Sequence, residues 1–350
     1  MMERNIYARA LEMVSEGGQA AIRTEFSGKE GRLDSSLQRT LTEAEVSKDE
    51  RGISRSAVTC RESEGRTVVM EPVFPRERLI ILGGGHVGLA LCEMAVMCDF
   101  HTIVCDDRPE FAGRERFPGA GEVLCDAFTV CLERLKITPR DYVVIVTRGH
   151  IHDGECLRKV LSGTQPAYTG MIGSRKRVGE QLAALLQEGF SRERIERVCT
   201  PIGLRIGAVT PREIAVSILA QMISYRRLPE YAQGRPWVET DLTWDMIRYL
   251  AQDPTSKKAV ATVIGTTGSA PGGAGAKMAV LPDGQIVGTI GGGWGESVII
   301  KEAVKLIGTG TYRVCTIEMN KDVSAKEGMA CGGSMQVLIE DASDFRASPR

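Results

Sequence analysis

The stretch from Leu79 to Leu91 reads LIILGGGHVGLAL. Its first four residues are apolar and predict a buried strand of a parallel sheet. Gly83, Gly85 and Gly88 follow with the spacing G-x-G-x-x-G, and apolar residues then recur at helical spacing. The first glycine permits a tight turn, the second lets a pyrophosphate approach the backbone, and the third lets helix and strand pack closely. The stretch therefore predicts a strand, an anion-binding turn and a helix.

A second strand and its acidic end extend this pattern. The stretch from His101 to Cys105 predicts a strand, and Asp106 and Asp107 follow it directly. These carboxylates lie 18 and 19 residues beyond Gly88, where a Rossmann domain places the carboxylate that binds a ribose hydroxyl. Together the two strands, the glycine turn, the helix and the acidic pair predict a Rossmann domain. They leave open whether NAD(P) or another ligand occupies it.

Strands and helices alternate between residues 76 and 230. Apolar stretches at 122–125, 141–146 and 167–172 predict further strands, and the alternation is typical of a parallel, doubly wound sheet. Ligands bind such sheets at the carboxyl ends of the strands. Besides the three glycines, the residues that the sequence places at this edge are His86, Asp106, Asp107, Arg148, His150, Gly173, Ser174 and Arg175.

The polar residues at this edge have two interpretations each. Arg148 and His150 suit anion binding or acid–base chemistry, or they form a salt-bridged loop with Asp153. Arg175 suits a phosphate at the start of a helix, or it belongs to a solvated basic turn. The sequence leaves these alternatives open.

The composition excludes several classes of protein. The chain has 350 residues, is 43% hydrophobic and 25% charged, and carries a formal net charge of −1. This balance argues against nucleic-acid binding. The apolar runs are only as long as strands, so we expect no membrane span, and the first residues do not predict a signal peptide. We therefore expect a cytoplasmic protein. None of the ten cysteines forms a CxxC motif, which argues against a zinc ribbon.

Changes in pattern predict three parts. We expect an α+β segment at 1–75, the Rossmann-like domain at 76–230, and a smaller α+β domain at 231–350. The order of helix, glycine and apolar strand occurs at 6–26 and again at 244–268. The recurrence suggests that the first segment is a degenerate copy of the last domain, without its glycine loops.

Three glycine-rich loops mark the C-terminal domain. They lie at 265–277, 288–296 and 328–333. Backbone N–H groups of such loops can line a concavity that accepts phosphate oxygens, or the glycines merely build tight strand connections. Taken together, three loops favour a ligand site. Its candidate residues are Gly268, Ser269, Lys277, Gly291, Gly292, Gly293, Glu296, Gly332 and Gly333, with Cys331 as the metal-binding residue.

Lys277 and Cys331 would supply the chemistry of this site. The Lys277 ammonium would add a positive charge for a phosphate. The thiol of Cys331 lies in a loop next to two glycines. As a thiolate it would bind a soft metal or accept sulfur, and the alternative is an inert buried thiol. We expect these three loops to form one ligand site.

These motifs resemble a known family. GGGHVG at 83–88, DDRPEF at 106–111, TRGH at 147–150 and GSR at 173–175 resemble the XdhC Rossmann domain. The loops at 268–278 and 288–296, with CGG at 331–333, resemble the XdhC/CoxI domain. The order of the two domains differs from the usual one. Gly272 stands where the family often has Arg, and Trp294 where it often has Cys.

The resemblance implies a molybdenum cofactor accessory protein rather than a catalyst. Such proteins bind the molybdopterin cofactor as cargo, hold it while an oxo group is exchanged for sulfur, and deliver it to a xanthine dehydrogenase-type molybdenum hydroxylase. The implied partners are the hydroxylase apoprotein and a cysteine desulfurase. By analogy we also expect a homodimer formed through the last helix of the Rossmann domain and the linker. An NAD(P)-dependent oxidoreductase and a nucleotide-sensing regulatory module remain as alternatives.

Overall fold

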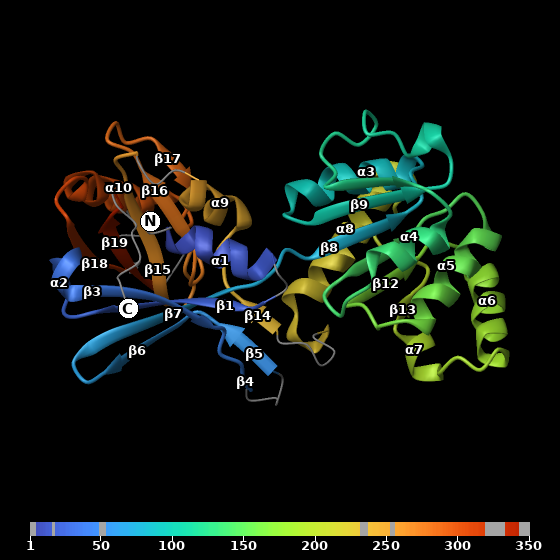
Figure 1. The fold of residues 1–350 in the computed structure, drawn as a ribbon, viewed down its shortest axis with the longest axis horizontal. Helices are drawn as coiled ribbons and strands as arrows, with labels where there is room; N and C mark the ends of the chain where they lie inside the picture. Colours follow the sequence, from blue (N-terminus) through green and yellow to red (C-terminus); the bar gives the residue numbers. More distant parts are fainter. Residues whose placement is uncertain are drawn as a thin grey trace. The chain divides into compact units, whose positions relative to one another are not determined.

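The computed structural model describes residues 5–15, 18–48, 54–231, 237–252, 256–318 and 333–342, without the side chains of 54, 175–177, 237 and 239. The chain forms two compact units (Figure 1). The Rossmann unit comprises Arg76–Trp237 with Glu50–Ser54. The antiparallel unit comprises Met1–Asp49, Arg55–Pro75 and Val238–Arg350. No helix in the described part of the chain combines the length and apolarity needed to cross a bilayer.

The Rossmann unit is built on a six-stranded parallel sheet. Its order is β10-β9-β8-β11-β12-β13, so the first strand, β8, is central and the chain winds outward to both sides. The expected parallel pairing of the first two strands is confirmed, because Leu79 lies opposite Thr102. The strands are β8 (Arg78–Leu82), β9 (His101–Asp106), β10 (Glu122–Cys125), β11 (Tyr142–Ile145), β12 (Tyr168–Met171) and β13 (Val198–Cys199).

Helices cover both faces of this sheet (Figure 1). Leu79 and Ile81 pack with α3 and α8 on one face, and Ile80 and Leu82 pack with α4 and α5 on the other. This double burial explains the four consecutive apolar residues of β8. The helical elements are α3 (His86–Met97), η1 (Pro109–Phe111), α4 (Phe128–Leu135), α5 (His150–Ser162), α6 (Arg175–Gln187), α7 (Arg192–Glu196), α8 (Pro211–Arg227) and η2 (Pro229–Tyr231).

The antiparallel unit contains a four-stranded sheet, β3-β1-β7-β6, and a six-stranded sheet, β17-β16-β15-β19-β18-β2. A small sheet, β14-β5-β4, completes the set of sheets described. The strands are β1 (Ala20–Phe26), β2 (Glu30–Arg32), β3 (Leu37–Glu43), β4 (Ser47–Lys48), β5 (Ser54–Ala57), β6 (Thr59–Ser63), β7 (Arg66–Val73), β14 (Trp237–Glu239), β15 (Ala259–Thr267), β16 (Lys277–Val280), β17 (Ile286–Gly288), β18 (Thr311–Glu318) and β19 (Ser334–Asp341).

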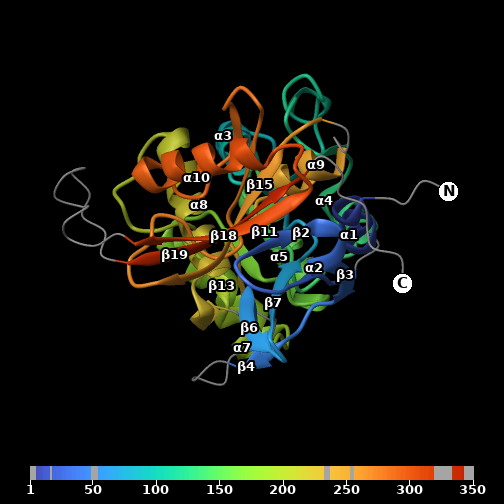
Figure 2. The same ribbon diagram turned by 90° about the vertical axis from the view of Figure 1, so that its left-hand side faces the viewer.

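Four helices accompany these sheets in the described part of the unit. They are α1 (Ile6–Ser15), α2 (Leu33–Ser36), α9 (Trp244–Gln252) and α10 (Gly293–Leu306). Helices α1 and α9 pack against each other, and both contribute to a core shared by the two large sheets. Helix α10 lies along one face of the six-stranded sheet (Figure 2), where Ile299 and Ala303 are buried against it.

The antiparallel unit consists of two halves with the same topology. The first half is α1, β1, β3, β6 and β7, and the second is α9, β15, β16, β18 and β19. The sheet order β3-β1-β7-β6 corresponds strand by strand to β16-β15-β19-β18. The register corresponds as well, because Thr24 pairs with Arg39 as Thr262 pairs with Lys277. This arrangement is the one that an internal duplication would produce, and the duplication stays a prediction.

The sequence placed segments 1–75 and 231–350 in separate parts, whereas both lie in the antiparallel unit. The physical reason is that each segment completes the other. Strand β2 of the first segment pairs with β18 of the last, and α1 packs on α9. Apart from the short segment Glu50–Ser54, the chain passes from one unit to the other at Pro75–Arg76 and returns at Trp237–Val238.

Two buried ion pairs cross between the halves. Lys277 of β16 contacts Glu71 of β7 at 2.7 Å, and Arg39 of β3 contacts Glu340 of β19. All four residues are buried. Burial lowers the pKa of Lys277, but the Glu71 carboxylate and Tyr7 together outweigh that effect, and the pKa lies above its ordinary value. The lysine is therefore charged at neutral pH.

The crossed pairs predict a large effect of single substitutions. Replacing Lys277→Met leaves Glu71 buried without its counter-ion, and should cost about 3–5 kcal/mol in the free energy of unfolding. Adding Glu71→Leu should recover most of that loss, because the unpaired charge is removed. Denaturant unfolding measures both effects.

Arg158→Met is the matched control, since it breaks an exposed pair with Glu188. It should barely change the unfolding midpoint. A Lys277→Met protein as stable as this control would contradict the assigned role of the buried pairs.

Candidate functional site

The glycine turn before α3 gives its three glycines different roles. Gly83 has a φ of +123°, and a Cβ there would lie 2.3 Å from the carbonyl oxygen of Val146. A Cβ on Gly88 would lie 2.0 Å from the carbonyl oxygen of Gly83. A Cβ on Gly85 would meet no atom within 4 Å. The fold therefore requires Gly83 and Gly88, whereas Gly85 leaves space for a ligand. His86, the first residue of α3, is exposed beside it.

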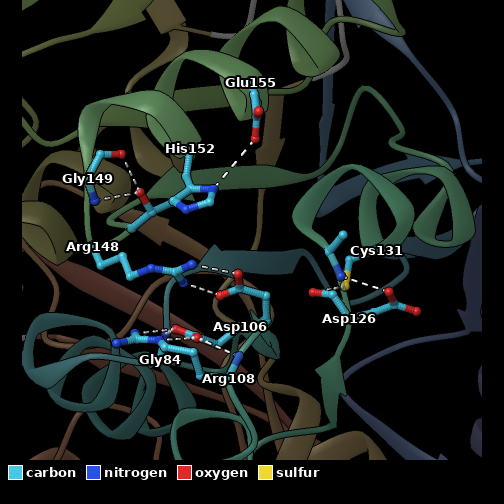
Figure 3. A network of polar contacts seen from close by, with 12 residues as sticks. Gly84, Asp106, Arg108, Asp126, Cys131, Arg148, Gly149, His152 and Glu155 are labelled. Carbon is cyan, nitrogen blue, oxygen red and sulfur yellow. Dashed lines mark hydrogen bonds and ion pairs between the residues drawn. The ribbon is translucent and has the colours of Figure 1, made fainter.

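Asp106 ties the glycine turn to the end of β9 (Figure 3). Its buried carboxylate accepts a hydrogen bond from the Gly84 N–H at 2.8 Å. It also accepts from the backbone N–H of Arg108 at 3.1 Å and from the Arg108 guanidinium at 2.9 and 3.0 Å. The guanidinium in turn lies 3.8 Å from the ring centroid of Phe111. A ribose hydroxyl, the expected partner of Asp106, would have to share a carboxylate that these donors already neutralise.

Asp107 pairs with Arg148 through both carboxylate oxygens, one contact measuring 2.8 Å. The hydrogen bonds from Arg148 lower the pKa of Asp107. Asp107 follows β9 and Arg148 lies in the loop after β11, and these strands flank β8. The pair therefore bridges the edge of the sheet where the glycine turn begins. The salt bridge foreseen for the loop at 147–150 forms with Asp107 rather than Asp153.

A cavity of about 180 Å³ opens at the carboxyl ends of β11 and β12. Three of the predicted residues, Arg148, His150 and Gly173, line it. Ser174 is the residue before α6, and the Arg175 side chain lies outside the described residues. The sequence did not select the other lining residues as candidates, and these are Thr147, Gly149, Asp153, Ile172, Val178 and Gln181.

Asp153 is the buried charge of this cavity. Its side chain lies in the first turn of α5 with 8% of the residue exposed. The Thr147 hydroxyl donates to Oδ1 at 2.6 Å, and no other side chain in the described part of the chain donates to this carboxylate. Burial raises the pKa of Asp153. Its position three residues after His150 was the one sequence signal that could have identified it.

In the antiparallel unit the first two predicted glycine loops meet backbone to backbone, and Gly333, the described residue of the third loop, lies against the first. A Cβ on Gly272 would lie 2.2 Å from the carbonyl oxygen of Ile290, and a Cβ on Gly333 would lie 2.3 Å from that of Thr267. Gly272 departs from the family pattern, and its packing leaves no room for a side chain. We call this contact region the loop cluster, defined by Thr267–Ser269, Pro271–Gly272, Ile290–Gly292 and Gly333.

Glu296 holds the second loop of this cluster. Its carboxylate accepts from the Thr289 hydroxyl at 2.5 Å and from the N–H groups of Ile290 and Gly292 at 3.0 and 3.1 Å. Gly291, Gly292 and Gly293 all have positive φ angles, as does Gly268 in the first loop. The carboxylate therefore occupies N–H groups that the sequence offered to a ligand.

Two further predicted residues take other positions. Lys277 points into the core, where Glu71 and the Thr262 hydroxyl each hold its ammonium at 2.7 Å, so it lies away from the surface of the loops. Trp294 packs partly buried against the core beneath α10. Cys331 and Gly332 lie outside the described residues, and Gly333 is the first residue described after them.

The different surroundings of the glycines predict different tolerances. Gly85→Ala adds a methyl group to open space at an ordinary φ of −67°, so the thermal midpoint should match that of the wild type. Gly88→Ala forces the backbone apart and should cost several kcal/mol. Calorimetry of both variants tests the assignment. A Gly85→Ala protein that melts as early as Gly88→Ala would show that Gly85 also serves the fold.

Two family models match the chain. The XdhC Rossmann domain matches residues 79–222, within the Rossmann unit, and the XdhC and CoxI family model matches residues 252–318, within the antiparallel unit. Together they cover more than half of the chain.

The chain is also similar to several known proteins. "Uncharacterized protein YqeB" of Escherichia coli is 36% identical over 43% of this chain and 28% of its own length. A probable xanthine dehydrogenase subunit from Bacillus subtilis is 29% identical over 45% of this chain and 46% of its own. The chain thus spans less than half of either relative. A crystal structure of a xanthine dehydrogenase from Bacillus halodurans is 26% identical over 62% of each chain, with a TM-score of 0.48. The chain belongs to the XdhC and CoxI family.

Proposed function

We propose that this chain is an accessory protein of a xanthine dehydrogenase-type molybdenum hydroxylase. It binds the molybdenum cofactor as cargo, holds it during sulfuration and delivers it to the hydroxylase apoprotein. The observation that carries the proposal is the meeting of two glycine-rich loops and Gly333 in the unit that contains the match to the XdhC and CoxI family model. The Bacillus subtilis relative, a probable component of xanthine dehydrogenase, supports the choice of partner.

The loop cluster suits a phosphate-bearing cargo with a soft metal. Small residues leave the backbone of these loops open to close approach. Thr289 and Glu296 engage the N–H groups of residues 290–292, so phosphate oxygens would bind other backbone N–H groups of the loops. Gly333, two residues after Cys331 in the sequence, lies against Thr267 and Ser269. As a thiolate, Cys331 would bind the molybdenum end of the cargo.

The proposed partners are the apoprotein, a cysteine desulfurase that supplies the sulfur, and a second copy of the chain. The proposal of a homodimer is supported by α8, the last helix of the Rossmann unit. Its Val216 and Ile223 side chains are exposed, and apolar side chains in water favour association.

A second candidate, an NAD(P)-dependent oxidoreductase or nucleotide sensor, is favoured by the open position of Gly85. The neutralised Asp106 counts against it, because its lone pairs are engaged. Fluorescence titration with NADH and NADPH separates the candidates, since an accessory protein should not enhance the fluorescence of either.

Cofactor content tests the proposal directly. The full chain, purified from cells that make molybdopterin, should release a fluorescent pterin after oxidation. Protein from cells that cannot make molybdopterin should release none. Absence of pterin from both preparations would overturn the proposal.

Cys331→Ser keeps the size of the residue but removes the soft ligand. The retained molybdenum cofactor should fall severalfold, while the thermal midpoint stays near that of the wild type. Cys60→Ser, at an exposed cysteine of the same unit, is the matched control and should retain the cofactor. Equal cofactor content in both variants would refute the role of Cys331, and a large drop in thermal midpoint would instead indicate a structural thiol.

A further inference from the structure

The cavity at the carboxyl ends of β11 and β12 is lined by the Asp153 carboxylate, which can accept more hydrogen bonds than the fold supplies. Asp153 is more than nine-tenths buried, and removing a carboxylate from water is costly unless donors replace the water. Thr147 supplies a side-chain donor, to Oδ1 at 2.6 Å. The described residues form no ion pair with Asp153, although His150, His152 and the Thr147 backbone also stabilise its carboxylate, and the nearby Arg148 is engaged by Asp107. The cavity therefore offers a carboxylate with unused acceptor capacity.

The remaining walls define the shape of a ligand. Ile172 and Val178 provide apolar surface, which suits the faces of a flat ring. Gln181 donates its amide N–H to the carbonyl oxygen of His150 at 3.0 Å. That bond fixes the amide group at the cavity wall, where its oxygen is a further acceptor. Both polar side chains, Asp153 and Gln181, thus present acceptors to the cavity.

We propose that this cavity binds the ring of a heteroaromatic ligand that presents two adjacent N–H donors to the Asp153 carboxylate. Such an edge occurs in the 2-amino-4-oxopyrimidine ring, which pterins and guanine share. Its N3–H and 2-amino groups match a carboxylate, one donor to each oxygen. Asp153 is the residue that recognises the ring, and Thr147 positions its carboxylate.

The size of the cavity limits what enters. About 180 Å³ is below the range of pockets that enclose whole drug-sized ligands, so it holds a ring and not the phosphate-bearing remainder. This inference deepens the proposed function, on which its choice of a pterin rests. A guanine nucleotide is the other source of the same ring, and the test separates the two.

Pterin and lumazine are the diagnostic probes. They share the bicyclic ring, but lumazine has a carbonyl where pterin has the 2-amino group. A carboxylate facing that carbonyl meets an acceptor instead of a donor, which a polar site rejects strongly. In fluorescence titrations at neutral pH, wild-type protein should bind pterin at least about tenfold more tightly than lumazine. Equal affinities of the wild-type protein for pterin and lumazine would overturn the proposal, whatever the variants show.

Asp153→Asn should reverse this preference. The Asn amide presents one acceptor and one donor, which complement the N3–H and the 2-carbonyl of lumazine. Binding of pterin should weaken at least about tenfold, and binding of lumazine should strengthen. Glu155→Gln, at an exposed carboxylate of the same helix, is the matched control and should bind both probes as the wild type does. An unchanged preference in Asp153→Asn would overturn the proposal.

Guanosine monophosphate forms the third arm. Tighter binding of pterin than of this nucleotide supports a pterin cargo, and the reverse order supports the same cavity as a guanine site. The outcomes also separate this inference from the proposed function. If the protein retains the molybdenum cofactor but shows no preference for pterin over lumazine, the proposal for the cavity is overturned and the proposed function stands. If the protein binds pterin selectively but retains no cofactor, the proposal for the cavity stands and the proposed function is overturned.

Discussion

The antiparallel unit depends on two ion pairs buried where water cannot screen them. Each pair joins one half to the other, because Lys277 reaches Glu71 and Arg39 reaches Glu340. The glutamates occupy corresponding places, opposite Ile22 of β1 and Val260 of β15. A two-fold related interface would give this exchange of partners. A half on its own would lack the glutamate that holds its cation in the whole unit, so the two pairs tie the halves together.

The Rossmann unit was predictable because its signals are local. Four apolar residues, a glycine spacing and an acidic strand end lie within about thirty residues, and each has one structural meaning in that context. The direction of Lys277 was not predictable in this way. It depends on the register of β16 with β15 and on the approach of β7 from a distant segment. The Glu296 carboxylate accepts from backbone N–H groups of the second glycine loop, and this role likewise depends on the fold of the loop and not on its sequence spacing.

Two buried carboxylates of the Rossmann unit show how surroundings decide a role. Asp106 receives hydrogen bonds from Gly84 and Arg108, and its charge is neutralised within the fold. Asp153 receives a side-chain hydrogen bond from Thr147 and lines a cavity. The sequence favoured Asp106, because its distance from Gly88 fits a known pattern. Sequence spacing cannot count the donors around a carboxylate, and that count distinguishes a structural acid from one available to a ligand.

The two halves of the antiparallel unit are alike in topology but not in their connections. In the first half, β6 and β7 are joined by the short turn at Glu64 and Gly65, whereas residues 319–333 separate the corresponding β18 and β19. The connection from β1 to β3 forms β2 and α2, while its counterpart from β15 to β16 is a glycine loop. The connection in the first half thus adds a strand, β2, to the six-stranded sheet. In the second half the connection from β15 to β16 is a glycine loop instead, so the two halves repeat one framework and differ in the connections between their strands.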